Sequence, residues 1–303
     1  FAKSAQIEMK CKTPRQTSPK AQSWTLSDQE KKVYGNRTPK DYIKLDILGR
    51  GGCALVWLAK QTATKQIVAL KQFPKNQGSI GSAKVEEDIF KQLGSNQLNA
   101  DHEGNKSISH LLSTIDDKKD VWLVYEVGGD SLSKALFNIK GEFHKGERIY
   151  FINHQDLYRS IKKNKNMLRQ LLVKLFNAFD LLHENGIVHA DIKSDNILVT
   201  YNSSEIIDVK IIDFGSAFMF ETAKCISMST PEYLAPEILS YLDNSNNPKY
   251  KEGVTSVFKT MKVWSYDMWS VGALLLEVIT GFPLWLSLKG RTRSITGKQI
   301  FGM

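Results

Sequence analysis

The residues that most suggest chemistry lie in segment 189–196, which reads His-Ala-Asp-Ile-Lys-Ser-Asp-Asn. Transfer of a phosphoryl group to a hydroxyl needs a carboxylate beside the attacking oxygen, a role that suits Asp191. It also needs a cation near the transferred group and a metal ligand close by, and Lys193 and Asn196 suit these roles. The same residues also suit a polar loop that caps a helix.

Two further stretches have residues that suit phosphate binding. Asp213 is followed by Phe214 and Gly215 where an apolar strand ends, and such a carboxylate can chelate magnesium between phosphates. Segment 49–56 reads Gly-Arg-Gly-Gly-Cys-Ala-Leu-Val, and its glycines let the backbone donate N–H groups to phosphate oxygens. The structural alternatives are a hairpin-turn Asp-x-Gly and an ordinary glycine turn.

A lysine and a glutamate are candidates for an ion pair. Ala69 and Lys71 lie on a predicted strand, whose two-residue period turns them to one face. The small side chain leaves room for a flat base, and the ammonium can reach phosphates. Glu86 on the following helix is preferred to Glu87 as the partner, because it lies one turn before Phe90. A solvated lysine and a solvated helix carboxylate are the alternatives.

The glycine segment at 49–56 and Lys71 need a small sheet to position them. Residues 41–73 are rich in β-branched side chains and alternate in polarity, which predicts three antiparallel strands. Residues 82–93 have helical spacing and are followed by Gly94, which predicts one helix. Residues 121–127 predict a further strand.

The pattern changes to mainly helical after Gly128 and Gly129, which predicts a hinge between a small sheet-rich lobe and a larger helical one. The elements expected there are an amphipathic helix at 168–182, short strands at 197–200 and 209–212, and a helix at 268–280. The last is apolar nearly all round, so we expect it to be buried.

The net charge of +9 is concentrated near the beginning of the chain. Residues 1–40 hold nine Lys/Arg and three Asp/Glu, a net charge of +6. We interpret them as a mostly disordered extension, because they are polar and show little periodicity. A basic tract of this kind is also suited to an acidic, nucleic-acid or membrane-lipid partner.

Composition limits the class of protein. The longest strongly apolar stretch, Val271 to Leu276, is too short to span a membrane, and residues 1–30 lack the apolar core of a secretory signal. Three widely spaced cysteines favour a reducing, intracellular setting, either cytoplasmic or nuclear. The chain does not begin with Met, which leaves open that the natural N-terminus is missing.

Taken in order, the motifs resemble those of the protein kinase family, from about Asp41 to Trp285. They are a glycine loop, Val-Ala-Leu-Lys, a helix Glu, His-x-Asp-x-Lys-x-x-Asn, Asp-Phe-Gly and, at 235–237, Ala-Pro-Glu. Residues 267–272, Asp-Met-Trp-Ser-Val-Gly, resemble the central helix of that family. Each motif alone is ambiguous, but seven in order make the resemblance specific.

The resemblance implies an α+β, bilobal kinase fold, with the small lobe in residues 41–127 and the larger lobe in 128–303. It also implies phosphorylation of protein substrates with ATP and Mg²⁺. Carried over residue by residue, the expected catalytic residues are Asp191 as base, Lys193, Lys71, Glu86 and Thr230. The expected nucleotide contacts are Gly49, Gly51, Val56, Ala69, Lys71, Glu126, Gly128 and Leu198. The expected metal ligands are Asn196 and Asp213.

The resemblance also implies finer assignments. Residues 124–128 resemble the hinge, with Tyr125 as a bulky gatekeeper and the backbone around Glu126 and Gly128 pairing with adenine. The expected apolar stack of the active state is His189, Phe90 and Phe214. Lys193 and Thr230 resemble the serine/threonine branch, in which the Thr hydroxyl bonds the catalytic Asp and Lys.

The chain departs from the family pattern at four points. Ala54 replaces the third glycine of the loop, and Ala190 replaces the Arg of the catalytic loop. Insertions at 141–165 and 240–262 are interpreted as partner surfaces or long loops. The chain ends before the family's last helices, without the Arg that pairs with Glu237, so the large lobe is expected to be incomplete.

Four functions therefore remain open from the sequence. An active serine/threonine kinase is favoured, because the expected catalytic and metal-binding residues are all present. A dual-specificity kinase and a pseudokinase scaffold are the alternatives. The basic residues 1–40 leave a nucleic-acid or membrane binder as a further alternative.

Overall fold

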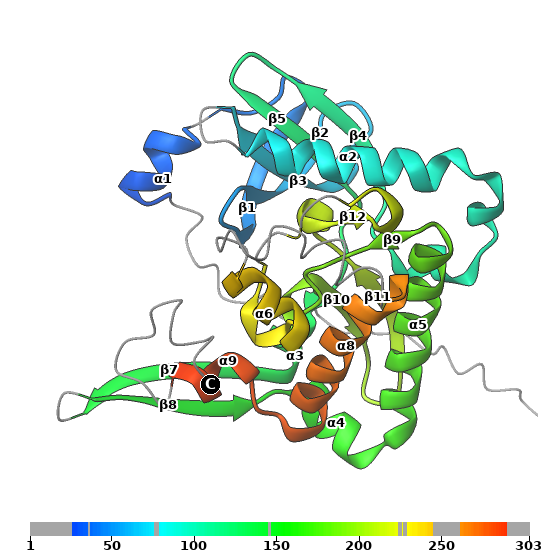
Figure 1. Ribbon diagram of the computed structural model, residues 1–303. Helices are drawn as coiled ribbons and strands as arrows, with labels where there is room; N and C mark the ends of the chain where they lie inside the picture. The colour runs from blue at the N-terminus through cyan, green and yellow to red at the C-terminus, as the bar shows by residue number, and fades with distance from the viewer. Residues whose placement is uncertain are drawn as a thin grey trace, which may run out of the picture.

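The computed structural model describes residues 26–35, 37–75, 79–144, 147–223, 226, 229–244 and 261–289. They form a small lobe built on a β-sheet and a larger, mainly helical lobe (Figure 1). The chain passes from the first to the second between Tyr125 and Asp130. The predicted α+β bilobal fold is confirmed.

The small lobe contains a five-stranded antiparallel sheet in the order β1-β2-β3-β5-β4. Its strands are β1 (Tyr42–Arg50), β2 (Leu55–Gln61), β3 (Ile67–Pro74), β4 (Leu111–Asp116) and β5 (Asp120–Tyr125). On β2 the alternation buries Leu55, Trp57 and Ala59 on one face. The predicted strands are confirmed, although the last one ends at Tyr125.

One long helix, α2 (Ile80–Ser95), lies across this sheet (Figure 1). It buries Ala83, Glu86, Ile89 and Leu93, whose spacing of three or four residues gives one inward face. The predicted helix is confirmed, but Gly94 does not end it. The helix continues to Ser95, because a glycine costs only about 1 kcal/mol within a helix.

An additional helix, α1 (Asp28–Val33), precedes the sheet, and it corrects the prediction of a mostly disordered extension for the described residues from Leu26 onward. Ser27 and Glu30 form a reciprocal capping box at its start. Leu26 and Tyr34 are buried in a cluster with the sheet residues of β1, β2, β3 and β5. Ordered structure therefore begins at least 15 residues before Asp41, and residues 1–25 lie outside the described part of the chain.

The larger lobe is organised around helices α5 and α8. Its helices are α3 (Leu132–Leu136), α4 (Asp156–Lys163), α5 (Lys165–Glu184), α6 (Pro236–Asn244), α8 (Val263–Thr280) and α9 (Leu284–Lys289). Its strands are β6 (Asp130–Ser131), β7 (Phe137–His144), β8 (Glu147–His154), β9 (Ile187–Val188), β10 (Ile197–Tyr201), β11 (Ile206–Ile211) and β12 (Phe218–Met219). The helix predicted at 168–182 and the two strands after it are confirmed.

Short 3-10 turns join several of these elements. They are η1 (Gln97–Ala100), η2 (Glu103–Ser107), η3 (Ser194–Asn196), η4 (Phe214–Ser216), η5 (Phe220–Thr222) and η6 (Pro231–Tyr233). The turns η3 and η4 hold the two loops that carry the candidate catalytic and metal-binding residues.

The insertion predicted at 141–165 is largely regular structure rather than a long loop. Strands β7 and β8 form an antiparallel hairpin that projects from the larger lobe, and α4 follows it (Figure 1). The hairpin begins at Phe137, before the predicted start. Of the second insertion, at 240–262, residues 245–260 lie outside the described residues.

Helix α8 is buried on only part of its circumference in the described chain, which corrects the prediction of a fully buried helix. Tyr266, Ser270 and Leu274 face the core. By contrast, Trp269, at 49% exposed, and Leu276, at 55% exposed, lie on the outer side.

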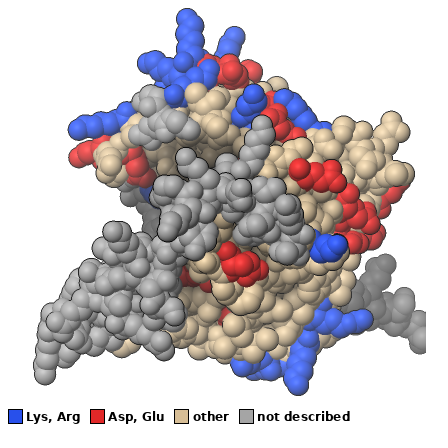
Figure 2. Space-filling model, viewed as in Figure 1, with Lys and Arg blue, Asp and Glu red and all other residues tan. Residues whose placement is uncertain are grey.

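Charge and hydropathy complete the description of the molecule. No helix among the described residues is long and apolar enough to cross a membrane. Lys and Arg side chains lie at the top of the small lobe and at the bottom of the larger one, with acidic side chains among those at the top (Figure 2).

Candidate active site

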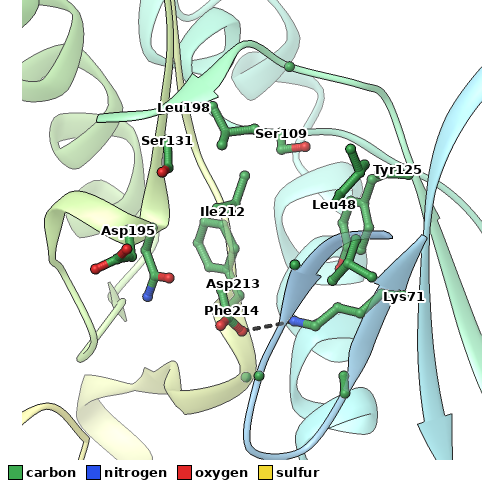
Figure 3. Close-up of a pocket in the computed structure, with 18 of the residues that line it drawn as sticks. Leu48, Lys71, Ser109, Tyr125, Ser131, Asp195, Leu198, Ile212, Asp213 and Phe214 are labelled. Atoms are coloured by element: carbon green, nitrogen blue, oxygen red, sulfur yellow. Dashed lines mark hydrogen bonds and ion pairs between the residues drawn. The ribbon is translucent and has the colours of Figure 1, made fainter. Parts of the chain in front are cut away.

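A cavity of about 810 Å³ lies between the lobes and receives residues from both. Figure 3 shows Leu48, Lys71 and Tyr125 approaching from the small lobe, and Leu198 and Ile212 from the larger one. All predicted nucleotide contacts line this cavity: Gly49, Gly51, Val56, Ala69, Lys71, Glu126, Gly128 and Leu198. Of the other predicted site residues, Glu86, Asp191, Lys193, Asn196 and Asp213 line it, whereas Thr230 does not.

Lys71 connects the two lobes inside the cavity. Its ammonium contacts the Glu86 carboxylate, which is only 1% exposed, and lies 2.8 Å from Asp213 Oδ1 (Figure 3). Burial alone lowers the pKa of Lys71, but the two carboxylates outweigh it and raise that pKa above its ordinary value. The predicted ion pair is present, and Glu87 instead pairs with Lys91 on the helix surface.

Asp213 is held in an unusual backbone conformation at the end of β11. Its φ of 66° lies in the left-handed region, which non-glycine residues adopt infrequently. Burial acts to raise the pKa of its carboxyl, but Lys71 outweighs this and lowers the pKa to about 2. The Asp213 side chain is therefore ionised at neutral pH.

Residues of the predicted catalytic loop, 189–196, form a hydrogen-bonded group around Asp191. Lys193 Nζ donates to Asp191 Oδ2 at 2.7 Å and to Thr230 Oγ1 at 2.8 Å. Thr230 Oγ1 in turn donates to Asp191 Oδ1 at 2.6 Å. Asn196 Nδ2 donates to the backbone oxygen of Asp191 at 2.8 Å and to its Oδ2 at 2.9 Å. The predicted Thr–Asp–Lys arrangement is present.

The backbone of this loop is fixed by a residue whose contribution the sequence did not reveal. Asp267 on α8 is fully buried, and its two carboxylate oxygens accept from the backbone N–H groups of His189 and Ala190 at 2.9 and 3.0 Å. Ala190 has a φ of 64°, so these bonds hold a strained residue directly before Asp191. The signal available in the sequence was an aspartate within a mainly apolar helix.

Close packing restricts both glycines that follow β5, Gly128 against the Leu198 side chain and Gly129 against the Val199 backbone. A Cβ on Gly128 would lie 2.6 Å from Leu198 Cδ1, and one on Gly129 would lie 2.0 Å from the backbone oxygen of Val199. Glu126 is anchored beside them, because its Oε1 lies 3.0 Å from Lys210 Nζ and 3.0 Å from the His110 N–H. These contacts hold the connecting segment against β10 and β11.

An aromatic stack runs from the small lobe to the catalytic loop. The Phe90 and Phe214 rings lie 5.1 Å apart, and the Phe214 and His189 rings lie 4.7 Å apart, each pair in an edge-on arrangement. The predicted stack is therefore present. The sequence did not indicate that Tyr125 extends it, with its ring 5.7 Å from that of Phe90.

A second cluster of metal-ligating side chains lies away from this cavity, at His102, Asp180 and Glu184. His102 Nδ1 accepts the Gly104 N–H at 3.0 Å, so the neutral ring carries its proton on Nε2, the nitrogen nearer the two carboxylates. That tautomer does not suit a metal ligand, and the cluster fits a surface polar contact.

Sequence comparisons agree with this geometry. The model of the family described as Protein kinase domain matches residues 42–301. The chain is similar to "Probable serine/threonine-protein kinase yakA" of Dictyostelium discoideum, at 26% identity over 84% of this chain and 14% of that protein. It is also similar to "Aurora kinase" of Schizosaccharomyces pombe, at 27% identity over 84% of this chain and 58% of that protein. A third relative is "Probable inactive protein kinase At3g63330" of Arabidopsis thaliana, at 28% identity over 60% of this chain and 54% of that protein. The chain thus spans between 14% and 58% of the length of these relatives.

Proposed function

Because the chain belongs to the protein kinase family, we propose that it transfers the γ-phosphoryl group of ATP to serine and threonine hydroxyls of proteins. The observation that carries the proposal is the joint arrangement of Asp191, Lys193 and Thr230 beside a cavity that also holds the Lys71–Glu86 pair. Proton removal, charge stabilisation and phosphate binding each have a suitable group in this arrangement.

Two residues fit the Mg²⁺ that this chemistry requires. Asp213 is ionised and lines the cavity. Asn196 uses its amide nitrogen toward Asp191, which turns its carbonyl oxygen the other way as an oxygen ligand. Bound Mg²⁺ neutralises charge on the phosphate oxygens. Asp213 and Asn196 would therefore hold the metal.

The remaining groups have separate roles in the proposed reaction. Asp191 accepts the proton of the attacking hydroxyl, and Lys193 stabilises negative charge on the transferred group. Lys71 binds phosphates while Glu86 holds it in place. Gly49, Gly51, Val56, Ala69, Glu126, Gly128 and Leu198 form the proposed nucleotide contacts. Together these residues orient the nucleotide and the acceptor for direct transfer.

The acceptor class rests on Thr230. Its hydroxyl lies between Asp191 and Lys193, which supports an acceptor site of the serine/threonine branch. The similarity to "Probable serine/threonine-protein kinase yakA" of Dictyostelium discoideum supports this acceptor class. The alternative is dual specificity, which the experiment below distinguishes from phosphorylation of Ser and Thr alone.

Two further proposals concern the setting of the protein. The three cysteines and their spacing support an intracellular location, either cytoplasmic or nuclear. The basic charge of residues 1–40 supports an acidic or nucleic-acid partner for that extension. A salt-dependent binding titration of the extension would test the second proposal.

Incubation with radiolabelled ATP and separate Ser, Thr and Tyr peptide libraries tests the proposed function. We expect Mg²⁺-dependent label on Ser and Thr. Asp191→Asn should lower turnover by about 10²-fold to 10⁴-fold while retaining nucleotide affinity. Asp213→Asn should instead weaken Mg²⁺-dependent nucleotide binding. Asp101→Asn, a change at an exposed aspartate, is the control.

Three results would contradict parts of this proposal. Nucleotide binding without label on any library would indicate a pseudokinase. Label mainly on Tyr would contradict the acceptor class. Normal turnover in Asp191→Asn or Asp213→Asn would contradict the assignment of that residue.

A further inference from the structure

Tyr125, at the end of β5, makes a polar contact that the motifs did not indicate. Its hydroxyl donates to Glu86 Oε2 at 2.5 Å, while the other oxygen of the same carboxylate contacts Lys71. Burial, followed by the nearby Glu86 charge, raises the pKa of Tyr125 well above its ordinary value, so the phenol keeps its proton. Tyr125 is therefore a hydrogen-bond donor to Glu86.

Glu86 needs both contacts because it is withdrawn from water. A buried carboxylate oxygen without a donor loses its hydration without compensation. Space around the carboxylate is restricted as well, since a Cβ on Gly215 would lie 3.2 Å from Glu86 Oε1. The carboxylate thus accepts one donor on each oxygen, a lysine and a phenol.

The two donors come from neighbouring strands of one sheet. Tyr125 pairs directly with Ala69 across β3 and β5, and Lys71 lies two residues further along β3 on the same face. Two donors on a rigid sheet fix both the position and the rotation of the carboxylate, whereas the ammonium alone would fix only one oxygen. Because Glu86 belongs to α2, the same contacts hold that helix against the sheet.

The ring and the hydroxyl of Tyr125 have separable effects. The ring packs edge-on against Phe90, one turn beyond Glu86 on α2. A phenylalanine would keep this packing and would lose only the donor. The hydroxyl is therefore the group whose contribution can be measured alone.

We propose that Tyr125 is a positioning residue for the phosphoryl transfer proposed above, acting through its hydroxyl on Glu86 and thereby on Lys71 and α2. It does not act on the reacting atoms itself. The inference rests on the proposed function, and its consequence for α2 can be measured without catalysis.

The test compares kcat and the KM for ATP in the wild type, Tyr125→Phe, Tyr125→Leu, Glu86→Met and the double variant Tyr125→Phe/Glu86→Met. Methionine has a length close to that of glutamate and offers no carboxylate. We expect Tyr125→Phe to lower kcat/KM by about ten-fold, as for a buried hydrogen bond to a charged group. In the Glu86→Met background the same change should have an effect of less than about two-fold, because the acceptor is absent.

Hydrogen exchange of residues 80–95, without nucleotide and well below the melting transition of each variant, gives a readout independent of turnover. We expect faster exchange of α2 in Tyr125→Phe than in the wild type. Tyr158→Phe is the matched control, because it removes a hydroxyl that donates to the Thr280 backbone oxygen at 3.0 Å in the larger lobe. It should leave both measurements unchanged.

The outcomes separate this inference from the proposed function. Wild-type kinetics and exchange in Tyr125→Phe would overturn the inference, as would an equal kinetic loss in both backgrounds. A large loss in Tyr125→Leu with none in Tyr125→Phe would assign the effect to ring packing and overturn it as well. If the wild type labels no substrate, the proposed function fails, and hydrogen exchange alone decides whether Tyr125 holds α2.

Discussion

Thr230 joins residues 215–233, the proposed activation segment, to residues 189–196, the proposed catalytic loop. Its hydroxyl donates to Asp191 and accepts from Lys193, so one oxygen atom links the proposed base to the proposed cation. The bridge fixes the relative positions of these two groups, which phosphoryl transfer requires. A side chain of the same shape without a hydroxyl should disturb the reaction more than the fold.

We therefore predict that Thr230→Val lowers kcat by at least about ten-fold, since it removes two hydrogen bonds to charged groups. Thr230→Ser keeps the hydroxyl and should retain most of the activity. Steady-state kinetics with a Ser-containing peptide, together with melting temperatures, provide the measurement. Equal rates in Thr230→Val and Thr230→Ser would contradict the predicted role of the hydroxyl.

At this scale the sequence predicted the groups that belong to motifs and missed those that act through distant contacts. Lys71, Asp191 and Asp213 follow from local spacing and residue type. Tyr125 bonds a residue 39 positions away, and Asp267 bonds the backbone of a loop 78 positions away. Such contacts depend on how strands and helices pack, and one sequence contains no local pattern for them.

At the scale of elements, helix α1 and the segment after it are tied to the sheet by an ion pair. Arg37 binds Asp120 with two nitrogens, one of them 2.8 Å from Oδ1, and also donates to the Val33 backbone oxygen at 2.9 Å. Asp120 is fully buried, and Gln72 also donates to it at 3.1 Å. These contacts explain why a polar segment without helical periodicity is ordered.

We predict that Arg37→Ala destabilises the protein by about 3 kcal/mol, because it leaves the buried Asp120 carboxylate without its cation. Chemical denaturation is the measurement. Lys31→Ala is the control, since Lys31 pairs with Asp28 on the surface and both side chains are more than half exposed. Its effect should stay below about 0.5 kcal/mol. Equal effects of the two changes would contradict the prediction.

A second prediction for this region concerns pH. Lys44 lies over the Trp57 ring, with its ammonium 3.8 Å from the ring centroid, and donates to the Arg37 backbone oxygen at 2.6 Å. Burial lowers the pKa of Lys44 to about 7 from its ordinary 10.5, with Asp120 opposing the shift and Arg37 adding to it. Above about pH 7 the folded protein therefore releases a proton that the unfolded chain keeps.

Because the unfolded state binds more protons in this range, the Lys44 contribution to stability should rise as pH increases from about 7 toward 10.5. In Lys44→Met this contribution is lost. Chemical denaturation of both proteins at several pH values between about 7 and 9 measures the difference in their free energies of unfolding. The contributions of other titrating groups largely cancel in this difference. Parallel stability curves for the two proteins would contradict the prediction.

Sequence periodicity was reliable for elements that bury a regular face and failed where order depends on a few distant contacts. The strands of the small lobe and helix α5 have clear periods of two and 3.6 residues. The order of α1 depends instead on isolated anchors, Leu26 and Tyr34, and on an ion pair spanning 83 positions. The β7–β8 hairpin overlaps the insertion predicted at 141–165 and begins before it, at Phe137.

At the scale of the whole molecule, apolar packing joins the activation segment to the catalytic loop and to α8. Ala190, Ile226 and Tyr266 belong to one buried cluster, together with residues of the loop before α6 and of α6 itself. Ser229 adds a polar link, because its hydroxyl donates to the Ala190 backbone oxygen at 2.7 Å. In many kinases an arginine at the position of Ala190 binds a phosphate on this segment and orders it. Here the position is occupied by Ala190, which is buried and contributes packing instead.

We therefore predict that activity depends little on phosphorylation of residues 215–233, because a phosphate there would lack its usual bidentate arginine partner. The segment contains Thr222, Ser227 and Ser229 as possible phosphorylation sites, and Ser227 lies outside the described residues. The measurement is the initial rate of phosphatase-treated enzyme, after mass spectrometry has shown residues 215–233 to be unmodified.

Ile226→Ala serves as the comparison, since it removes packing from the cluster without affecting any phosphate and should lower the rate of treated and untreated enzyme alike. If dephosphorylation abolishes most activity and rephosphorylation restores it, a cation elsewhere in the chain performs the role of the missing arginine, and the apolar cluster alone does not set the active arrangement.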